Sequence, residues 1–424
     1  MSPTPLSALS KQVLAVWLLG CAALPFGVLM PAGERTASMA VSAALLTAAG
    51  LAVGVAYARR WRPAWHLVQV CLLAAVAMGA YWSNRWLFIG ASALLIYLYF
   101  SLYAPEVREE FDIHAAPREV GVLLVLLGMC SALTLLRPRF LEGGNLLDLA
   151  RQFSMVGIMA VGMTMVIVLG GIDLSVGSIV ALSGCLATLA IQQRDSPLWA
   201  AVAIALAVGA AVGAFNALLI SGFRMAPFII TLGTMCMARS LALVVTGAKQ
   251  VTVTGRSAQG ALHNVAWGDT LGLPNPVWLM ALVVLAGHVF LCYTRTGRHI
   301  YYIGANEEAA RLSGLSVRAV KGLVYTLCGA LAGLAGLVQA ARLDTGQPSA
   351  GAGDELKVIA AVIIGGASFA GGVGTVLGAL LGAAIMGVLR QGLIMLEVET
   401  NWQEFVQGAV IIGAVALDLL RKRR

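Results

Sequence analysis

Residues 154–191 read SMVGIMAVGMTMVIVLGGIDLSVGSIVALSGCLATLAI, an apolar stretch that Gly170, Gly171 and Asp173 interrupt near its middle. A transmembrane helix needs roughly 20 mainly apolar residues, so this stretch is long for one membrane crossing and short for two. Residues 358–389 are likewise long for one crossing and short for two, and they are also broken by glycines. Non-helical backbone at membrane depth is tolerated only where protein or a water-filled cavity covers it. Both stretches therefore predict either tight turns between short spans or broken helices along a translocation path.

The whole chain has the composition of a membrane protein. Of its 424 residues, 59% are apolar and 11% are charged, and its mean hydropathy is +0.87. Soluble domains carry roughly 25% charged residues. These values exclude a soluble enzyme, a disordered protein and a small disulfide-built domain, and they predict an all-α polytopic membrane protein.

Fourteen apolar stretches are candidate membrane spans, and a charged segment divides them into a region 1–117 with four spans and a region 118–424 with ten. The first four are Val13–Met30, Ser38–Ala58, Ala64–Tyr81 and Trp86–Tyr103. The later ten are Val120–Leu136, Ser154–Leu169, Leu174–Ile191, Pro197–Ser221, Pro227–Thr246, Pro274–Tyr293, Gly322–Ala341, Val358–Ala370, Gly374–Leu389 and Gln403–Leu420. Glycines four residues apart, such as Gly209 and Gly213 or Gly329 and Gly333, lie on one helix face and predict close helix packing.

Basic residues gather in clusters between the apolar runs. One cluster lies at residues 59–62, a second within residues 294–321 and a third at residues 421–424. With the N-terminus in the cytoplasm, all three lie on the cytoplasmic side, as the positive-inside rule requires. The same topology predicts a cytoplasmic C-terminus. Because the clusters follow the membrane pattern, the net charge of +8 does not indicate a nucleic-acid partner.

The sequence offers no constellation for bond chemistry. It contains no GxxxxGK[ST] phosphate loop, so we do not expect the chain to bind ATP in the P-loop manner. It contains neither HExxH nor GxSxG, and its seven cysteines include no CxxC pair. We therefore expect no catalytic residue, no metal and no cofactor in this chain.

Few ionisable residues lie within the apolar runs, and the main ones are Asp173 and Arg239. A charge inside a membrane is costly and is therefore a functional candidate. Asp173 has two interpretations. It can cap the helix that restarts after the break, by accepting hydrogen bonds from the backbone of Ser175 or Val176, or it can act directly in a transport path. The two roles are compatible, because the helix dipole favours a negative charge at a helix start.

Residues 304–314 read GANEEAARLSG and predict a short helix in a cytoplasmic loop. Asn306 is a good N-cap, and Glu307 and Glu308 occupy the first turn, where negative charge is favoured. Gly314 is a natural C-terminal stop. So short a helix is marginal in isolation, so we expect it to dock on its own bundle or on a second protein.

At these residues the chain resembles the permease subunits of bacterial ABC importers for monosaccharides, of the ribose, xylose, arabinose and galactose type. The resemblance covers about residues 118–424 and is carried by residues 170–178 (GGIDLSVGS), Asn216, residues 227–232 (PFIITL), 304–314, 341–353 and 363–374. The later segments and the basic C-terminal tail resemble the xylose permease most closely. Members of the family usually begin near the span at Val120, so residues 1–117 are a departure from its pattern.

The resemblance implies a type II-like importer fold of about ten spans for residues 118–424. It implies a second permease chain, forming a homodimer in the bacterial inner membrane, and an ATP-binding cassette ATPase subunit on the cytoplasmic side that binds ATP and magnesium. A periplasmic sugar-binding protein would deliver the sugar. By the same resemblance, the coupling helix pressed by the ATPase would comprise Asn306, Glu307, Glu308, Ala309, Ala310, Arg311, Leu312 and Gly314 within the loop 294–321.

Candidates for the translocation path or its hinges are small and polar residues. They are Gly171, Asp173, Ser175, Gly177, Ser178, Asn216, Thr231, Gln339, Gly365 and Gly366, with Gln347 as a further polar candidate. Each polar candidate has an alternative role in an interhelical hydrogen bond. The resemblance favours a pentose such as xylose. Alternatives are a permease for another small polar solute such as autoinducer-2, a stand-alone secondary carrier, and an intramembrane enzyme, which the absence of a catalytic constellation disfavours.

Overall fold

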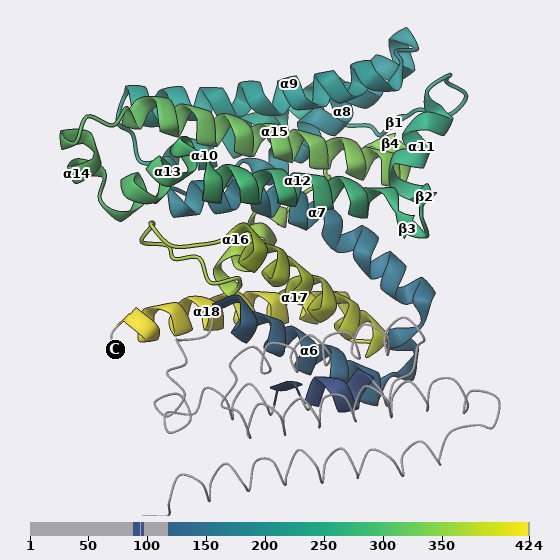
Figure 1. Ribbon diagram of the computed structural model, residues 1–424. Coiled ribbons are helices and arrows are strands. Elements are labelled where there is room, and N and C mark those ends of the chain that lie inside the picture. The colour runs from purple at the N-terminus through teal and green to yellow at the C-terminus, as the bar shows by residue number, and fades with distance from the viewer. Residues whose placement is uncertain (1–87, 94, 97–117, 423–424) are drawn as a thin grey trace, which may run out of the picture. The chain divides into compact units, whose positions relative to one another are not determined.

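The computed structural model describes residues 88–93, 95–96 and 118–422, and these residues are predominantly helical (Figure 1). The chain divides into two compact units, Met1–Leu146 and Leu147–Arg424. The four spans predicted within residues 1–117 lie almost wholly outside the described residues. Their number and the role of this region therefore remain predictions.

In the first unit, the described residues form helix α6 (Arg118–Leu136) and the 3-10 helix η2 (Pro138–Leu141). Helix α7 (Gly143–Val168) begins in this unit and continues into the second. Between Val120 and Leu136, α6 carries no charged residue, as expected of the span predicted there.

The second unit contains, after α7, a series of helices with short connections. They are α8 (Val176–Arg194), α9 (Leu198–Ala217), the π-helical turn η3 (Leu218–Gly222), α10 (Pro227–Thr246), α11 (Gln259–Trp267), α12 (Asn275–Tyr293), α13 (Arg295–Ala305), α14 (Glu307–Leu312), α15 (Val317–Leu343), α16 (Asp354–Ile364), α17 (Val376–Met395) and α18 (Thr400–Lys422). Two antiparallel pairs of short strands complete the unit. Strand β1 (Val251–Thr252) pairs with β4 (Thr345–Gly346), and β2 (Asp269–Thr270) pairs with β3 (Leu273–Pro274).

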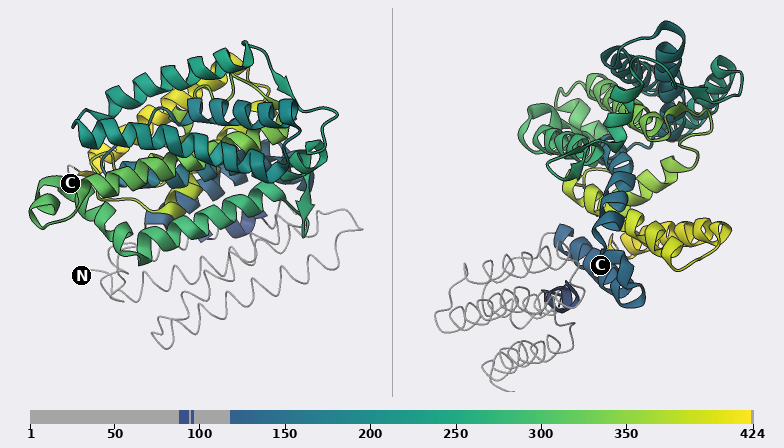
Figure 2. Two further views of the ribbon diagram at one scale, coloured as in Figure 1. Left: turned by 90° about the horizontal axis from the view of Figure 1, so that it is seen from above. Right: turned by 90° about the vertical axis from the view of Figure 1, so that its right-hand side faces the viewer.

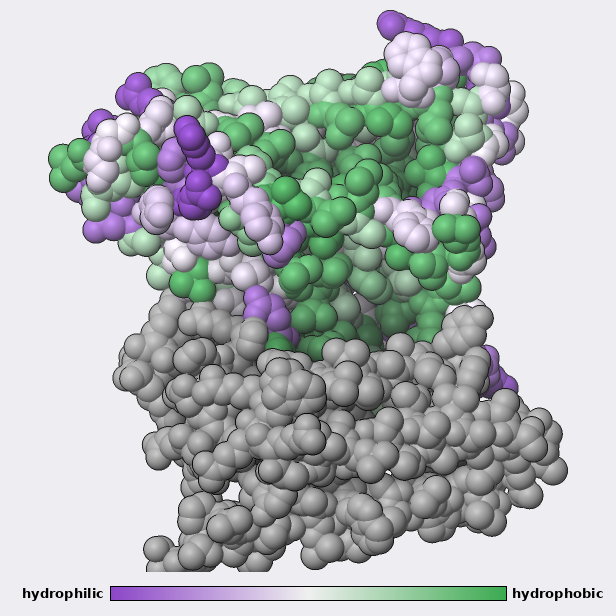
Figure 3. Space-filling model, viewed as in Figure 1, coloured by the Kyte–Doolittle hydropathy of each residue, from purple (hydrophilic) through white to green (hydrophobic). Residues whose placement is uncertain are grey.

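Eight helices of the described part of the chain are long and apolar enough to cross a membrane: α6, α7, α8, α9 with η3, α10, α12, α15 and α17. The surface of the second unit agrees with this pattern. Polar residues gather at its two ends, and a broad hydrophobic band lies between them (Figure 3). The chain is therefore an all-α polytopic membrane protein.

Helix α7 is the central helix of the second unit, because all of its residues from Gly157 to Val168 are buried. Helices α9 and α15 lie side by side along their length (Figures 1 and 2). Their contact is a glycine seam: a β-carbon at Gly209 would collide with the carbonyl oxygen of Gly329, and one at Gly213 with that of Tyr325. The four-residue glycine spacing thus packs backbone against backbone, as predicted.

Three predictions about the elements need correction. Two helices occupy the stretch 154–191, as the spans Ser154–Leu169 and Leu174–Ile191 predicted, but α7 begins at Gly143, eleven residues before the first predicted span. The span predicted at Val358–Ala370 is only an 11-residue helix, α16, and is preceded by a non-helical segment. Helix α13 was not predicted, since its arginines and histidine make it too polar for a span.

Candidate functional site

Helix α14 projects from one end of the second unit, and β2 and β3 lie at the opposite end (Figures 1 and 2). The side chain of Asn306 caps α14 by accepting a 2.9 Å hydrogen bond from the amide of Ala309. The helix stops before Gly314, which has a φ of 83° and donates its amide to the carbonyl of Arg311 at 3.0 Å. The predicted cap and stop of this helix are confirmed.

Two contacts fix the position of α14. The ammonium group of Lys321 on α15 lies 2.8 Å from the carboxylate of Glu307, and the side chain of Ala310 is buried. Arg311 pairs with Glu308 at 2.6 Å within α14 itself. Leu312, in contrast, is 80% exposed. The helix is therefore held to its own unit on one side and offers an ion pair and a leucine on its outward side.

Four glycines, Gly170, Gly304, Gly371 and Gly372, form what we call the glycine junction. A β-carbon at Gly304 would collide with the carbonyl oxygen of Val168, and one at Gly371 would lie 3.1 Å from Cα of Gly170. Gly371 and Gly372 have φ values of 83° and 72°, which favour glycine. At this junction the end of α7, the end of α13 and the α16–α17 loop meet backbone to backbone.

The glycine junction lies next to α14 in the chain. Gly304 is the second-last residue of α13, and only Ala305 separates it from the N-cap of α14. The hydroxyl of Tyr301 on α13 also donates to the carbonyl of Gly374 at 2.7 Å. Few atoms therefore separate α14 from the end of α7 and from the α16–α17 loop.

The turn between α7 and α8 collects several of the polar candidates. One carboxylate oxygen of Asp173, Oδ1, accepts hydrogen bonds from the amide of Ser175 at 2.9 Å and from its hydroxyl at 2.6 Å. The amide of Asn216 on α9 donates to the Ser175 hydroxyl at 2.9 Å. Thr231 on α10 lies 3.4 Å from the carbonyl of Ile172, although its better partner is the carbonyl of Pro227 in its own helix. The structure thus brings Asp173, Ser175, Asn216 and Thr231 together, all of them buried.

The predicted hydrogen bond from the backbone of Ser175 to Asp173 is confirmed. The N-cap residue of α8 is Ser175, and Asp173 lies two residues before it, where its carboxylate reaches the Ser175 amide. Three buried polar atoms at this turn have no hydrogen-bond partner among the described residues: Oδ2 of Asp173, Oδ1 of Asn216 and the hydroxyl of Tyr325. Since buried polar atoms are normally paired, this turn retains unused hydrogen-bonding capacity inside the bundle.

The segment 346–353, which we call the re-entrant segment, runs from β4 back into the bundle along α8. Gly346 packs against Thr188, and Gly351 packs against Gly177 near the start of α8. Between these two points α8 rises by about 16 Å, roughly half of the hydrocarbon thickness of a bilayer. Helix α16 starts at the inner end of this segment, so a half made of turns and a helical half together replace the span predicted at Val358–Ala370.

Arg239 on α10 clamps the re-entrant segment. Its guanidinium donates to the carbonyls of Pro348 at 2.8 Å and Ala350 at 2.5 Å, and to that of Gly177 at 3.4 Å. Hydrogen bonds from a charged group are strong and satisfy carbonyl groups that this non-helical backbone leaves without helical partners. The sequence singled out Arg239, but its partners are backbone carbonyls, which leave no signature in the sequence.

The other candidates occupy different surroundings. Gly171 lies against the hydroxyl of Tyr325, and Gly177 lies against both Gly351 and Glu355. Ser178 is buried, and its hydroxyl has no partner among the described residues.

Three candidates do not join the Asp173 turn. Gly365 packs against Gly378 of α17, and Gly366 has a φ of 96° at the end of α16. Gln339 lies about 21 Å along α15 from the Tyr325 position. A cavity of about 400 Å³ lies between α9, α11, α12 and α15, and none of the path candidates lines it.

Comparison with known proteins gives a consistent set of relatives. The family model described as branched-chain amino acid transport system / permease component matches residues 145–415. The ribose import permease protein of Escherichia coli strain K12 is 45% identical over 299 residues, which cover 70% of this chain and 92% of the relative. The ribose import permease protein of Bacillus subtilis strain 168 is 41% identical over 317 residues, covering 75% and 97%.

The xylose transport system permease protein of Escherichia coli strain K12 is 35% identical over 342 residues, which cover 67% of this chain and 87% of the relative. Identity to these ribose permeases therefore exceeds identity to the xylose permease, whereas the motifs alone favoured xylose. No solved structure matches the chain. Because the family model matches most of its length, the chain belongs to this permease family, whose model is described as branched-chain amino acid transport system / permease component.

Proposed function

We propose that the chain is the permease subunit of an ATP-driven importer for a monosaccharide, in a bacterial inner membrane with both termini in the cytoplasm. Its relatives carry names that describe ribose import and xylose transport. The higher identity to the ribose permeases favours ribose over xylose as the sugar. A transported sugar is an uncharged polyol, which suits a bundle whose buried candidates are mostly neutral hydrogen-bonding groups.

The observation that carries the proposal is the connection between α14 and the glycine junction. Gly304 contacts the last residue of α7, Val168, while the chain that leaves it forms α14. In the proposed mechanism an ATP-binding cassette ATPase subunit binds ATP and magnesium and grips α14 from the cytoplasm. Closure of the ATPase displaces α14, and the glycine junction passes the displacement to α7 and to the α16–α17 loop.

Two features next to the glycine junction are suited to rearrange when α14 is displaced. The Asp173 turn directly follows α7, and its unpaired polar atoms supply hydrogen-bonding capacity. The re-entrant segment is non-helical backbone packed along α8, a feature typical of a translocation path. We propose that these two features rearrange when the pathway switches between outward-open and inward-open states. A second permease chain completes the pathway, and a periplasmic sugar-binding protein delivers the sugar.

The test is reconstitution of the full chain in proteoliposomes with its cognate ATPase and binding protein. We expect uptake of labelled ribose that requires both partners and hydrolysable ATP, with xylose and autoinducer-2 as competitors that rank the solute class. The chain alone, with an imposed proton or sodium gradient, is the control. Gradient-driven uptake by the chain alone would identify a secondary carrier and overturn the proposal.

A further inference from the structure

The hairpin formed by β2 and β3 has an unusual residue at its tip. Its two turn residues, Leu271 and Gly272, both have positive φ, at 54° and 77°. Two-residue hairpin turns of this kind favour Asn-Gly or Asp-Gly, because a bulky side chain is strained there. Leu271 is also 89% exposed, so it gains no burial within the described part of the chain. Positions that break a local rule in this way are expected at functional or strained sites.

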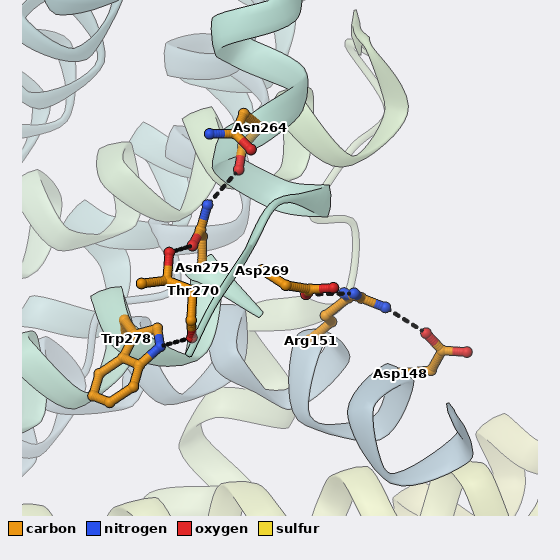
Figure 4. Close-up of polar contacts among 7 residues, drawn as sticks. All are labelled: Asp148, Arg151, Asn264, Asp269, Thr270, Asn275 and Trp278. Carbon is orange, nitrogen blue, oxygen red and sulfur yellow. Dashed lines mark hydrogen bonds and ion pairs between the residues drawn. The ribbon is translucent and has the colours of Figure 1, made fainter. Parts of the chain in front are cut away.

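The polar groups of this hairpin are paired on its inner side (Figure 4). The guanidinium of Arg151 lies 2.9 Å from the carboxylate of Asp269, the only charged residue on the hairpin strands, and 2.9 Å from that of Asp148. The hydroxyl of Thr270 donates to the side chain of Asn275 at 2.7 Å, and the indole of Trp278 donates to the Thr270 carbonyl at 2.8 Å. These contacts make the hairpin rigid and leave its outward surface apolar.

The hairpin leads directly into the membrane helix α12. Trp278 lies in the first turn of α12, and Trp267 lies just before β2, where its indole donates to the carbonyl of Arg342 at 3.0 Å. Tryptophans at the end of a span are typical of the membrane–water interface. Trp278 also begins an exposed apolar face of α12 that continues through Leu282, Leu285 and Val289.

We propose that the β2–β3 hairpin is an interfacial lipid anchor, with Leu271 and its neighbour Leu273 inserted into the leaflet opposite α14. Leu273 is 40% exposed and widens the apolar tip. A lipid surface is the occupant that the structure favours, because the tip continues the exposed apolar face of α12 and the only carboxylate on its strands, Asp269, is paired with Arg151. The rigid inner contacts then fix the outer end of α7, through Arg151, at the membrane surface.

The test measures the depth of the tip in a bilayer. The full chain, with its native cysteines replaced by alanine, receives a single cysteine at position 271 (Leu271→Cys), is labelled with a small fluorophore and is placed in lipid nanodiscs. The controls are Leu282→Cys on the apolar face of α12 and Arg256→Cys, an exposed residue at the same end of the second unit. We expect nitroxide lipids to quench the 271 label at least twofold more than the 256 label, and aqueous iodide to quench it at least twofold less.

Two results would overturn the proposal. The first is iodide quenching at position 271 equal to that at position 256. The second is iodide access that disappears only when the soluble binding protein is added, which would identify a protein partner. If the cysteine-free chain does not fold, Leu271→Asn in the native chain gives a second test. Asn suits the turn, so in detergent we expect the Leu271→Asn variant to melt at the same temperature as the parent or higher. In nanodiscs, where the lipid contact of Leu271 is lost, we expect it to melt at a lower temperature than the parent. Equal melting temperatures of variant and parent in nanodiscs would refute the anchor.

Discussion

The backbone amide of Gly372 donates a 2.8 Å hydrogen bond to the carbonyl oxygen of Val168, the last residue of α7. Gly304, at the end of α13, lies against the same oxygen. One carbonyl group is therefore the shared contact of three chain segments that lie far apart in the sequence. Any side chain at this point separates the segments, so their coupling depends on glycine.

Gly304→Ala tests this coupling. The added β-carbon would overlap the Val168 carbonyl oxygen, and we expect a moderate loss of stability, about 1–3 kcal/mol, as for other overpacked positions. Relative to the parent, the amount of sugar transported per ATP hydrolysed should fall much more than the fraction of protein that is folded. The measurement combines melting in detergent with ATP-driven uptake in proteoliposomes.

The matched control is Gly322→Ala on α15, where no atom lies within 4 Å of the new β-carbon. Alanine is the better helix former by roughly 1 kcal/mol, so this variant should transport normally and melt no lower than the parent. Parent-like coupling in Gly304→Ala would show that the glycine junction does not transmit motion.

Asp173→Ala should be strongly destabilising, because it removes the acceptor of two buried hydrogen bonds from Ser175. Unpaired buried donors cost about 1–3 kcal/mol each. Asp173→Asn keeps an oxygen acceptor and should recover most of the melting temperature. Ser178→Ala is the control, since the buried Ser178 hydroxyl has no partner among the described residues and its loss should be neutral. Equal melting of Asp173→Ala and Ser178→Ala would contradict the proposed hydrogen-bond network.

The sequence predicted the elements whose signals are local. Helix α10 has the predicted bounds Pro227–Thr246, because proline marks its start and the apolar run marks its length. Helix α14 was predicted from Asn306 and Gly314, which act on their own neighbours. The start of α7 was missed because Asp148 and Arg151 make its first turns polar. Arg151 pairs with Asp148 in its own helix and also with Asp269, more than one hundred residues later, and this distant partner is invisible to local patterns.

In the candidate site, too, the sequence predicted residues with a local signal but not the contacts between distant residues. Asp173 and Arg239 stood out as charges within apolar runs, and both make buried or half-buried hydrogen bonds. Gly170 and the glycines within residues 358–389 stood out as breaks in apolar stretches, but the contacts of the glycine junction and of the re-entrant segment did not, because they join backbone atoms of distant residues. Backbone carbonyls are present in every residue, so only the three-dimensional arrangement shows which of them Arg239 and Gly304 contact.

Arg239→Ala should release the re-entrant segment, since the carbonyls of Pro348 and Ala350 lose their charged donor. Hydrogen bonds to charged groups contribute about 1.5–3 kcal/mol, so amide exchange in residues 347–353 should accelerate roughly tenfold or more. Hydrogen exchange with mass spectrometry measures this directly. Arg239→Lys should accelerate exchange less, because lysine keeps the charge but not the planar fork. Arg256→Ala, an exposed control, should leave exchange in this segment unchanged, and the same acceleration in both alanine variants would contradict the clamp.

The ion pair between Lys321 and Glu307 provides the sharpest test of α14. The Glu307 carboxylate is largely exposed, and exposed pairs contribute at most about 1 kcal/mol, so Glu307→Lys and Lys321→Glu should each fold and insert normally. Each single change places like charges together and pushes α14 away from α15. We therefore expect ATP hydrolysis by the partner to continue while uptake falls several-fold.

The double variant with both charges exchanged restores the attraction and should recover uptake to near the parent level. This rescue separates the position of α14 from direct contact between Glu307 and the ATPase. If α14 positions the coupling contact, the exchanged pair works. If the ATPase instead contacts the Glu307 carboxylate directly, the double variant stays as inactive as Glu307→Lys alone, and the role assigned to the ion pair is wrong.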